Sequence, residues 1–272
     1  MRITAASVFV VLIFASLSAQ QPAPPSAAAP AQAAAPPSMP SGPEIAAALT
    51  RLMNNDARLR DWANLTRYRE ANRSLGAPKA GETRVVFMGD SITDAWPQPR
   101  YGDFFAVNTS YVGRGISGQT TPQMLIRFRP DVIDLKPKVV VILAGTNDIA
   151  GNTGAMTNEE IQGNLASMAQ LAKANGIRVV MSSIQPVSAY HTNPNGAPQT
   201  QTRPMERIRA VNAWMKKYAA DERHVYLDYF AAMTDDQGLL REELSADDLH
   251  PNAKGYAIMG PLAQAAIQQA LR

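Results

Sequence analysis

Val85-Val86-Phe87-Met88-Gly89-Asp90-Ser91 joins four apolar residues to a glycine and two polar residues, and this junction indicates the architecture. A strand with one face in water alternates apolar and polar residues, whereas this run is apolar on both faces, as is typical of a parallel strand covered by helices on each side. Val139-Val140-Val141-Ile142-Leu143 has the same character and leads into Gly145-Thr146-Asn147-Asp148. Because ligands bind at the carboxyl ends of strands in open parallel sheets, we expect both polar motifs at a binding edge.

Short β-branched runs alternate with helical patterns along the rest of the chain. The expected strands cover residues 84–88, 105–111, 139–143, 178–182 and 225–228, and the expected helices cover 120–131, 157–176, 204–221 and 253–271. A strand followed by a helix, repeated in this way, predicts an α/β fold. The prediction is a three-layer α/β/α sandwich around a five-stranded parallel sheet with right-handed crossovers.

The composition is that of an ordinary soluble globular protein with one main domain, with 272 residues, 46% of them hydrophobic, and a formal charge of +3. The 26 Lys and Arg residues only slightly outnumber the 23 Asp and Glu residues and are not gathered in one segment, so nucleic acid is not an expected partner. The lack of cysteine excludes disulfides and thiolate chemistry. No feature of the sequence marks an oligomer interface.

The N-terminal part divides into three predicted segments. Residues 1–19 have the basic, apolar and small-residue regions of a secretory signal peptide, which predicts a periplasmic or secreted protein without stable membrane insertion after cleavage. The alternative is an uncleaved N-terminal anchor. Residues 20–43 are almost entirely Pro, Ala, Gln and Ser, which predicts a disordered linker. Helical spacing over 44–80 predicts an extension packed on the main domain at 81–272, with Trp62 and Tyr68 as packing residues.

Asp247-Asp248-Leu249-His250 offers a base and an acid for acyl transfer. A serine hydroxyl attacks an ester only when a base accepts its proton, and a third group must hold that base in the required tautomer. The chain has three histidines, and His191 and His224 lack such company. His250 follows Asp247 by three positions, so on one helical turn the carboxylate would lie beside the imidazole.

Ser91, directly after the first expected strand, is the candidate nucleophile. Asp248 competes with Asp247 as the acid, but a residue two positions before the histidine would face away on a helical turn. Acyl transfer also needs donors aimed at the oxyanion. The candidates are the Ser91 N–H, a glycine N–H within Gly115-Ile116-Ser117-Gly118, and the side-chain amide of Asn147. The histidines lack partners at metal-ligand spacing, so no metal is predicted.

In this order and in these strand contexts, the motifs resemble the blocks of the SGNH hydrolases, also called the GDSL esterase/lipase family. The resemblance covers roughly 82–272 and rests on four blocks, Gly89-Asp90-Ser91-Ile92-Thr93, Gly115-Ile116-Ser117-Gly118-Gln119-Thr120, Gly145-Thr146-Asn147-Asp148 and Asp247-Asp248-Leu249-His250-Pro251-Asn252. Thr93 stands where the nucleophile elbow Gly-x-Ser-x-Gly would place its second glycine, which disfavours the α/β-hydrolase fold.

The resemblance implies a role for each matched residue. Ser91 would be the nucleophile, His250 the general base and then acid, and Asp247 the carboxylate that orients His250. The oxyanion hole would consist of Ser91 N–H, Gly118 N–H and Asn147 Nδ2. The family likeness also implies the flavodoxin-like strand order 2-1-3-4-5, which the spacing of the motifs does not establish.

The predicted reaction is hydrolysis of carboxylic esters with short acyl chains through an acyl-enzyme on Ser91, without metal or cofactor. The polar loop over 188–203 is expected to rim the pocket, and its amide side chains suit a sugar, which favours a small-molecule or glycan ester such as a carbohydrate O-acetyl ester. The alternatives are lysophospholipase-like or arylesterase activity, acyl transfer on the same triad, and a non-catalytic glycan-binding module.

Asp90, Trp96 and Arg114 are further candidates for substrate binding. Trp96, just past the nucleophile, either lines the acyl site or packs in the core. Arg114 either binds an anionic group of the substrate or pairs with a surface acid such as Asp103.

Overall fold

The computed structural model describes residues 41–191 and 196–272, and contacts divide the chain into the units 1–48 and 49–272. The second unit contains one parallel sheet in the order β2-β1-β3-β4-β5. Its strands are β1 (Val85–Gly89), β2 (Tyr111–Gly115), β3 (Val139–Leu143), β4 (Arg178–Ser182) and β5 (Val225–Leu227). The predicted five-stranded parallel sheet and its flavodoxin-like order are therefore confirmed.

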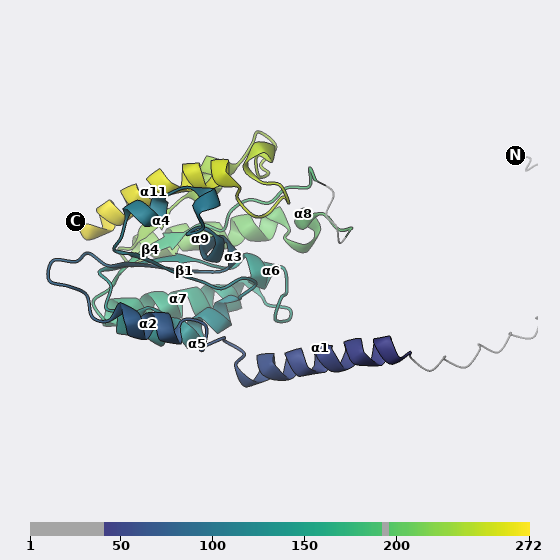
Figure 1. Cartoon of the computed structure of the whole chain (residues 1–272). Coiled ribbons are helices and arrows are strands. Elements are labelled where there is room, and N and C mark those ends of the chain that lie inside the picture. Colours follow the sequence, from purple (N-terminus) through teal and green to yellow (C-terminus); the bar gives the residue numbers. More distant parts are fainter. Residues whose placement is uncertain (1–40, 192–195) are drawn as a thin grey trace, which may run out of the picture. The chain divides into compact units, whose positions relative to one another are not determined.

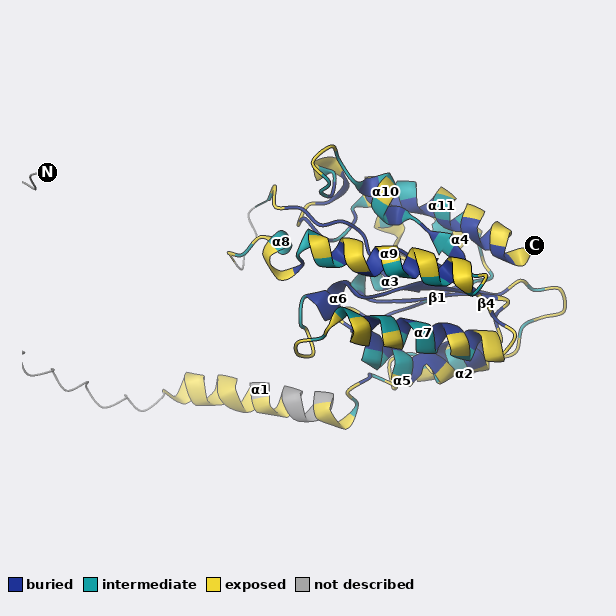
Figure 2. Cartoon of the chain, turned by 180° about the vertical axis from the view of Figure 1, so that it is seen from behind, coloured by how far each residue is buried: buried dark blue, intermediate teal, exposed yellow. Residues whose placement is uncertain are grey.

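Alternate residues of each strand pack against different layers of helices. Val86 and Met88 of β1 belong to one core with residues of α5 (Thr121–Asp131), α7 (Asn158–Ala174) and α9 (Met205–Asp221). Val85 and Phe87 belong to a second core with residues of α10 (Tyr229–Met233) and α11 (Ala253–Leu271). Figure 1 shows the sheet between helices on its two faces, with α11 on one side and α5 and α7 on the other. Figure 2 shows that α7, α9 and α11 carry both buried and exposed residues, as expected of helices that cover a sheet. Every residue of β1 and β3 is buried, as the apolar runs predict.

The connections at the carboxyl edge of the sheet carry short helices and turns. They include α3 (Ser91–Ala95) after β1, α6 (Thr146–Ile149) after β3 and α8 (Gln199–Thr202) after β4. Other short elements are α4 (Phe104–Val107) and the 3₁₀ turns η1 (Pro99–Tyr101), η2 (Ile133–Leu135) and η3 (Glu242–Leu244). The motifs that follow β1 and β3 thus start at the same edge of the sheet.

The second strand lies later in the chain than the sequence predicts. Residues 105–111 were expected as a strand, but Phe104–Val107 form the helix α4 and the strand β2 is Tyr111–Gly115. The strand was hard to recognise because it contains two glycines. A Cβ on Gly115 would lie 2.1 Å from the backbone N of Asp94, so the close packing of α3 against β2 requires glycine at this position.

The helical pattern before the main domain forms α1 (Gly42–Arg60) and α2 (Arg69–Leu75). In α1 the side chains of Leu52, Met53 and Leu59 are exposed. The segment after α1 is tied to the sheet, because Tyr68 donates a hydrogen bond to the Gly115 carbonyl and Asn72 donates to the Asp131 carboxylate.

The predicted signal peptide at 1–19 and nearly all of the predicted linker at 20–43 lie outside the described residues. Within 41–191 and 196–272, none of the helices combines the length and apolar character needed to cross a bilayer.

Candidate active site

Ser91 is the first residue of α3 and follows β1 after a single residue. Asp90 caps this helix, since its Oδ1 accepts a hydrogen bond of 3.0 Å from the backbone N–H of Ile92. The serine side chain is thereby held at the end of a buried strand and at the positive end of a short helix. Its Oγ lies 2.9 Å from Nε2 of His250, which is 159 positions later in the chain.

His250 is fixed from its other side by Asp247. The ring Nδ1 lies 2.7 Å from Asp247 Oδ2, and Asp247 Oδ1 accepts a hydrogen bond of 2.7 Å from the His250 backbone N–H. Partial burial raises the pKa of Asp247, but the hydrogen bonds from His250 outweigh it and the net pKa is lowered. Asp247 is therefore ionised at neutral pH and favours the tautomer in which Nδ1 carries the proton.

The Asp247–His250 segment is not the helical turn that the spacing suggested. These residues form an irregular loop in which Asp248 has a left-handed φ of +66°. Asp247 and His250 meet because Oδ1 of Asp247 accepts hydrogen bonds from the backbone N–H groups of Leu249 and His250. The carboxylate thus organises the loop that carries the histidine.

Asp248 faces away from His250, as expected, although the left-handed backbone rather than a helical turn is the reason. Its carboxylate is buried and accepts hydrogen bonds from the Ser188 hydroxyl and from the backbone N–H groups of Tyr190 and His191. The ring Nδ1 of His191 lies 3.0 Å from Asp248 Oδ1, and this hydrogen bond raises the pKa of His191. A second Asp–His pair therefore anchors the loop after β4 beside the first pair.

The three predicted oxyanion donors belong to three connections that follow β1, β2 and β3. The Ser91 N–H begins α3, Gly118 is exposed with a φ of +77°, and Asn147 is buried in α6. The Asn147 Nδ2 donates one hydrogen bond of 3.0 Å to the Gln119 carbonyl. A primary amide has two N–H groups, so this bond fixes the orientation of Asn147 and leaves a second donor.

Two buried arginines, which sequence reasoning missed, support these connections. Arg127 donates to the backbone carbonyls of Gly89 and Arg114 and to the Gln119 side chain, so one guanidinium ties the end of β1 to the loop after β2. Arg203 donates to Thr146 Oγ1 at 3.2 Å and lies 3.5 Å from Asn147 Oδ1. No local pattern indicates these roles, because Gly89 lies 38 positions from Arg127 and Thr146 lies 57 positions from Arg203.

The three other candidate residues are buried and make contacts within the protein. Trp96 is 3% exposed and stacks on Phe104 with ring centroids 4.7 Å apart, so it packs in the core. Arg114 is buried, donates to Asn72 and lies over the Tyr68 ring, and so it joins α2 to β2 instead of pairing with Asp103. Asp90 is fully buried as the cap of α3.

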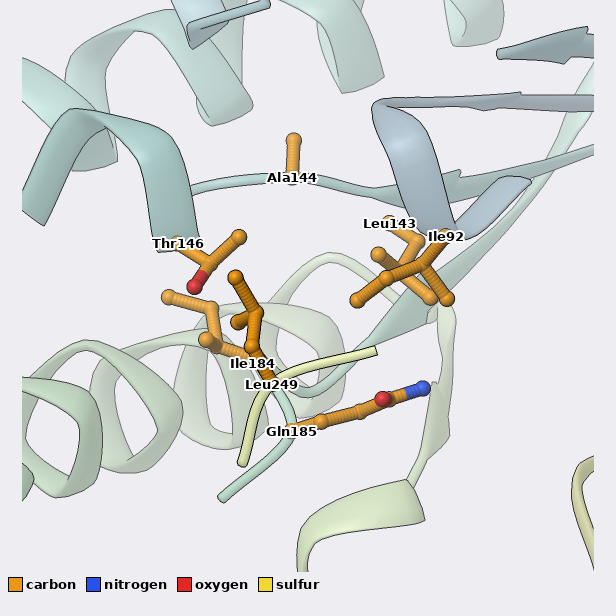
Figure 3. Close-up of a pocket in the computed structure, with 7 residues that line it drawn as sticks. All are labelled: Ile92, Leu143, Ala144, Thr146, Ile184, Gln185 and Leu249. Carbon is orange, nitrogen blue, oxygen red and sulfur yellow. The ribbon is translucent and has the colours of Figure 1, made fainter. Parts of the chain in front are cut away.

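A small apolar hollow is lined in part by residues that are adjacent in sequence to the site residues. Ile92, Thr146 and Leu249 are adjacent in sequence to Ser91, Asn147 and His250, and they line the hollow with Leu143, Ala144, Ile184 and Gln185. Figure 3 shows Thr146, Ile184, Leu249 and Ile92 gathered around a common gap. The hollow has no room for a water molecule, so this part of the molecule offers no channel for a long acyl chain.

A hydroxyl, an imidazole and a carboxylate joined in this order can activate the hydroxyl for attack on a carbonyl. Within 41–191 and 196–272, no cluster of three or more His, Asp or Glu side chains is placed to hold a metal ion.

The profile of the GDSL-like lipase/acylhydrolase family matches residues 87–258, so the chain belongs to that family. A GDSL-like lipase of Bacteroides thetaiotaomicron VPI-5482 with a known crystal structure is 42% identical, with a TM-score of 0.70, and the match covers 76% of this chain and 98% of that one. The protein is a hydrolase that acts on esters.

Three relatives match by sequence. Esterase TesA of Pseudomonas aeruginosa is 33% identical over 187 residues, which are 64% of this chain and 82% of TesA. An acetylxylan esterase of Geobacillus stearothermophilus is 35% identical over 88 residues, 24% of this chain and 40% of the esterase. The uncharacterized lipoprotein YqeF of Bacillus subtilis is 32% identical over 129 residues, 42% of this chain and 53% of YqeF. The chain thus spans about half of YqeF and less than half of the acetylxylan esterase.

Proposed function

We propose that the protein is a serine esterase that removes short acyl groups, such as acetyl, from a carbohydrate ester. The observation that carries this proposal is the chain of hydrogen bonds from Ser91 Oγ through His250 to Asp247, at 2.9 and 2.7 Å. A lone histidine or serine would carry no such inference, but the three groups together have the geometry that nucleophilic catalysis needs.

In the proposed mechanism, Ser91 Oγ attacks the ester carbonyl while His250 Nε2 accepts the hydroxyl proton. The N–H groups of Ser91 and Gly118 and the Asn147 amide stabilise the oxyanion. The tetrahedral intermediate collapses, the bond to the alcohol oxygen breaks, and His250 gives its proton to the leaving alcohol. Water then attacks the acyl-enzyme with His250 as the base, which releases the carboxylic acid and restores Ser91.

Two observations support a short acyl group on a polar alcohol. The apolar hollow beside the site has no room for a water molecule, which disfavours a long chain. The segment after β4 brings amide and guanidinium groups to the rim, where Arg203 donates to Gln199 at 2.6 Å and Gln199 lies 3.5 Å from the Asp247 carbonyl. A relative whose name gives acetylxylan as its substrate agrees with this choice.

We also propose that the protein is exported, because residues 1–19 have the organisation of a signal peptide. N-terminal sequencing of protein recovered from the periplasm or medium tests this. A mature N-terminus near residue 20 is expected, and an intact Met1 in a membrane fraction would instead favour an anchor.

The central experiment compares wild-type protein with Ser91→Ala on p-nitrophenyl acetate, p-nitrophenyl butyrate, p-nitrophenyl decanoate and acetylated xylotetraose. Wild type is expected to prefer acetyl over decanoyl esters and to release acetate from the sugar, while Ser91→Ala retains only the background rate. Equal rates from the two proteins would overturn the serine mechanism, and a preference for decanoate would overturn the short acyl group.

A further inference from the structure

A polar groove of about 740 Å³ begins at Gly118 and is walled by separate segments of the chain. One wall is the segment 61–66, which precedes the region that matches the family profile. The other walls are the loop after β2, with Ser117 and Gly118, and residues 152–153 after α6. Because Gly118 is a proposed oxyanion donor, the groove borders the proposed oxyanion hole.

The segment 61–66 is held in a fixed position by its backbone. Gln123 Nε2 donates to the Trp62 carbonyl at 2.7 Å, and Gln119 Nε2 donates to the Ala63 carbonyl at 2.8 Å. The Asp61 carboxylate accepts hydrogen bonds from the N–H groups of Leu65 and Thr66 and so closes the turn. These bonds leave the Trp62 side chain 41% exposed at the groove. The expectation that Trp62 is a packing residue is therefore only partly met.

The groove is suited to a neutral polyhydroxyl ligand. Its uncharged polar residues are Asn64, Thr66, Ser117, Gln119, Gln123, Asn152 and Thr153. Amides and hydroxyls donate and accept hydrogen bonds as sugar hydroxyls do, and an indole offers a large apolar face next to a polar edge. Among the described residues that line the groove, Asp61 is the charged one, and its carboxylate closes the turn. These walls therefore offer no basic side chain to a negatively charged glycan.

We propose that this groove binds the alcohol part of the substrate, and that this part is a neutral pyranose oligosaccharide with one ring stacked on Trp62. The proposal rests on the proposed ester hydrolysis at Ser91. The apolar hollow beside the site has no room for a water molecule, so the larger part of an ester would extend along the groove. Trp62 is thus a binding residue that acts on specificity and not on bond cleavage.

The test uses the full chain and compares Trp62→Ala and Trp62→Phe with Leu65→Ala. Leu65 is 38% exposed on the same turn but does not line the groove, so Leu65→Ala is the matched control. For each protein, kcat/KM is measured on p-nitrophenyl acetate and on acetylated xylotetraose, mannotetraose and cellotetraose. The oligosaccharide-to-aryl ratio is expected to fall at least tenfold in Trp62→Ala for the preferred sugar and less in Trp62→Phe, and to stay within twofold in Leu65→Ala.

A second measurement separates this proposal from the chemistry. In a Ser91→Ala background, isothermal titration calorimetry is expected to show binding of the acetylated tetrasaccharides, and Trp62→Ala is expected to weaken this binding at least tenfold. An unchanged ratio for all three sugars, or undiminished binding without Trp62, would overturn the groove proposal and leave the esterase proposal intact. Full activity of Ser91→Ala would instead overturn the proposed function. Thermal unfolding of each variant reports whether the fold is retained.

Discussion

Asp247 holds both the ring Nδ1 and the backbone N–H of His250, each at 2.7 Å, so a single carboxylate sets the position and the tautomer of the histidine. Replacing Asp247 with Asn keeps the size of the side chain but removes the charge and allows the wrong tautomer. We expect kcat for p-nitrophenyl acetate to fall about 10³ to 10⁴-fold, by analogy with the same change in other triads, with a smaller change in KM. A loss of less than tenfold would contradict this role.

Asp248→Asn is the matched comparison, because Asp248 is adjacent to Asp247 in sequence but is buried and does not contact His250 through its carboxylate. Its two oxygens accept hydrogen bonds from Ser188, Tyr190 and His191, and an amide NH₂ would face one of these donors. We expect the free energy of unfolding to fall by about 1 to 3 kcal/mol, while kcat falls far less than in Asp247→Asn. Urea unfolding and steady-state kinetics on both variants check the contrast, and equal loss of kcat would refute it.

Asn147→Ala tests the oxyanion hole. The Asn147 amide is fixed by the Gln119 carbonyl at 3.0 Å and is buried, so its second N–H acts in a site with little water. Removal of one such donor is expected to lower kcat about 10² to 10³-fold with KM nearly unchanged. Steady-state kinetics with p-nitrophenyl acetate measure this. A rise in KM at constant kcat would show that Asn147 binds the ground state instead.

Asp90 predicts a pH dependence of stability. Burial raises the pKa of Asp90 to about 6, and the hydrogen bond from the Ile92 N–H only partly opposes this. An unfolded Asp titrates near pH ~4, so between these values the folded state binds more protons, and the free energy of unfolding falls as pH rises. The difference of about two pKa values corresponds to ~3 kcal/mol.

The matched variant is Asp90→Asn, which keeps an acceptor for Ile92 but cannot ionise. Urea unfolding at about pH 4 and about pH 7.5 is expected to show a loss of stability in wild type that the variant lacks, because all other titrating groups are common to both. If the free energy of unfolding changed with pH in the same way in both proteins, ionisation of Asp90 would not destabilise the folded protein.

Trp96→Ala tests the packing role of Trp96. Its ring contacts Phe87, Phe104, Phe105 and Tyr256, so truncation leaves a large cavity. We expect a loss of about 3 to 5 kcal/mol in the free energy of unfolding. The indole N–H has no hydrogen-bond partner among the residues that the structure describes, so Trp96→Phe is expected to lose less. A change in acyl-chain preference in the Phe variant would instead point to contact with the acyl group.

Local patterns in the sequence were sufficient for the parts of the fold that local physics decides. The apolar runs of β1 and β3 are buried on both faces, and the capping box at Thr157 and Glu160 starts α7. The strand β2 escaped recognition because packing against α3, and not strand propensity, selects its glycines. Tertiary contacts of this kind leave no periodic pattern.

In the candidate site too, the residues in local motifs were recognised and those that act through long-range contacts were not. Ser91, Asp247 and His250 were selected from their motifs, and the structure brings them together, although the loop that carries His250 is not helical. Arg127 and Arg203 were missed because their role consists of hydrogen bonds to residues far along the chain. Trp62 was assigned to packing because an aromatic residue at helical spacing usually packs, and only its exposure at the groove distinguishes it.

The side-chain amides of Gln119 and Gln123 donate hydrogen bonds to main-chain carbonyls of the segment 61–66, and these bonds involve none of its side chains. The side chain of Trp62 is therefore replaceable without loosening this support, whereas Asp61 and Thr66 close the turn through their own side chains and Asn64 has a left-handed φ of +54°. For protein engineers, position 62 is a natural place for a library aimed at new glycans, because substitutions there leave Ser91, His250 and Asp247 untouched.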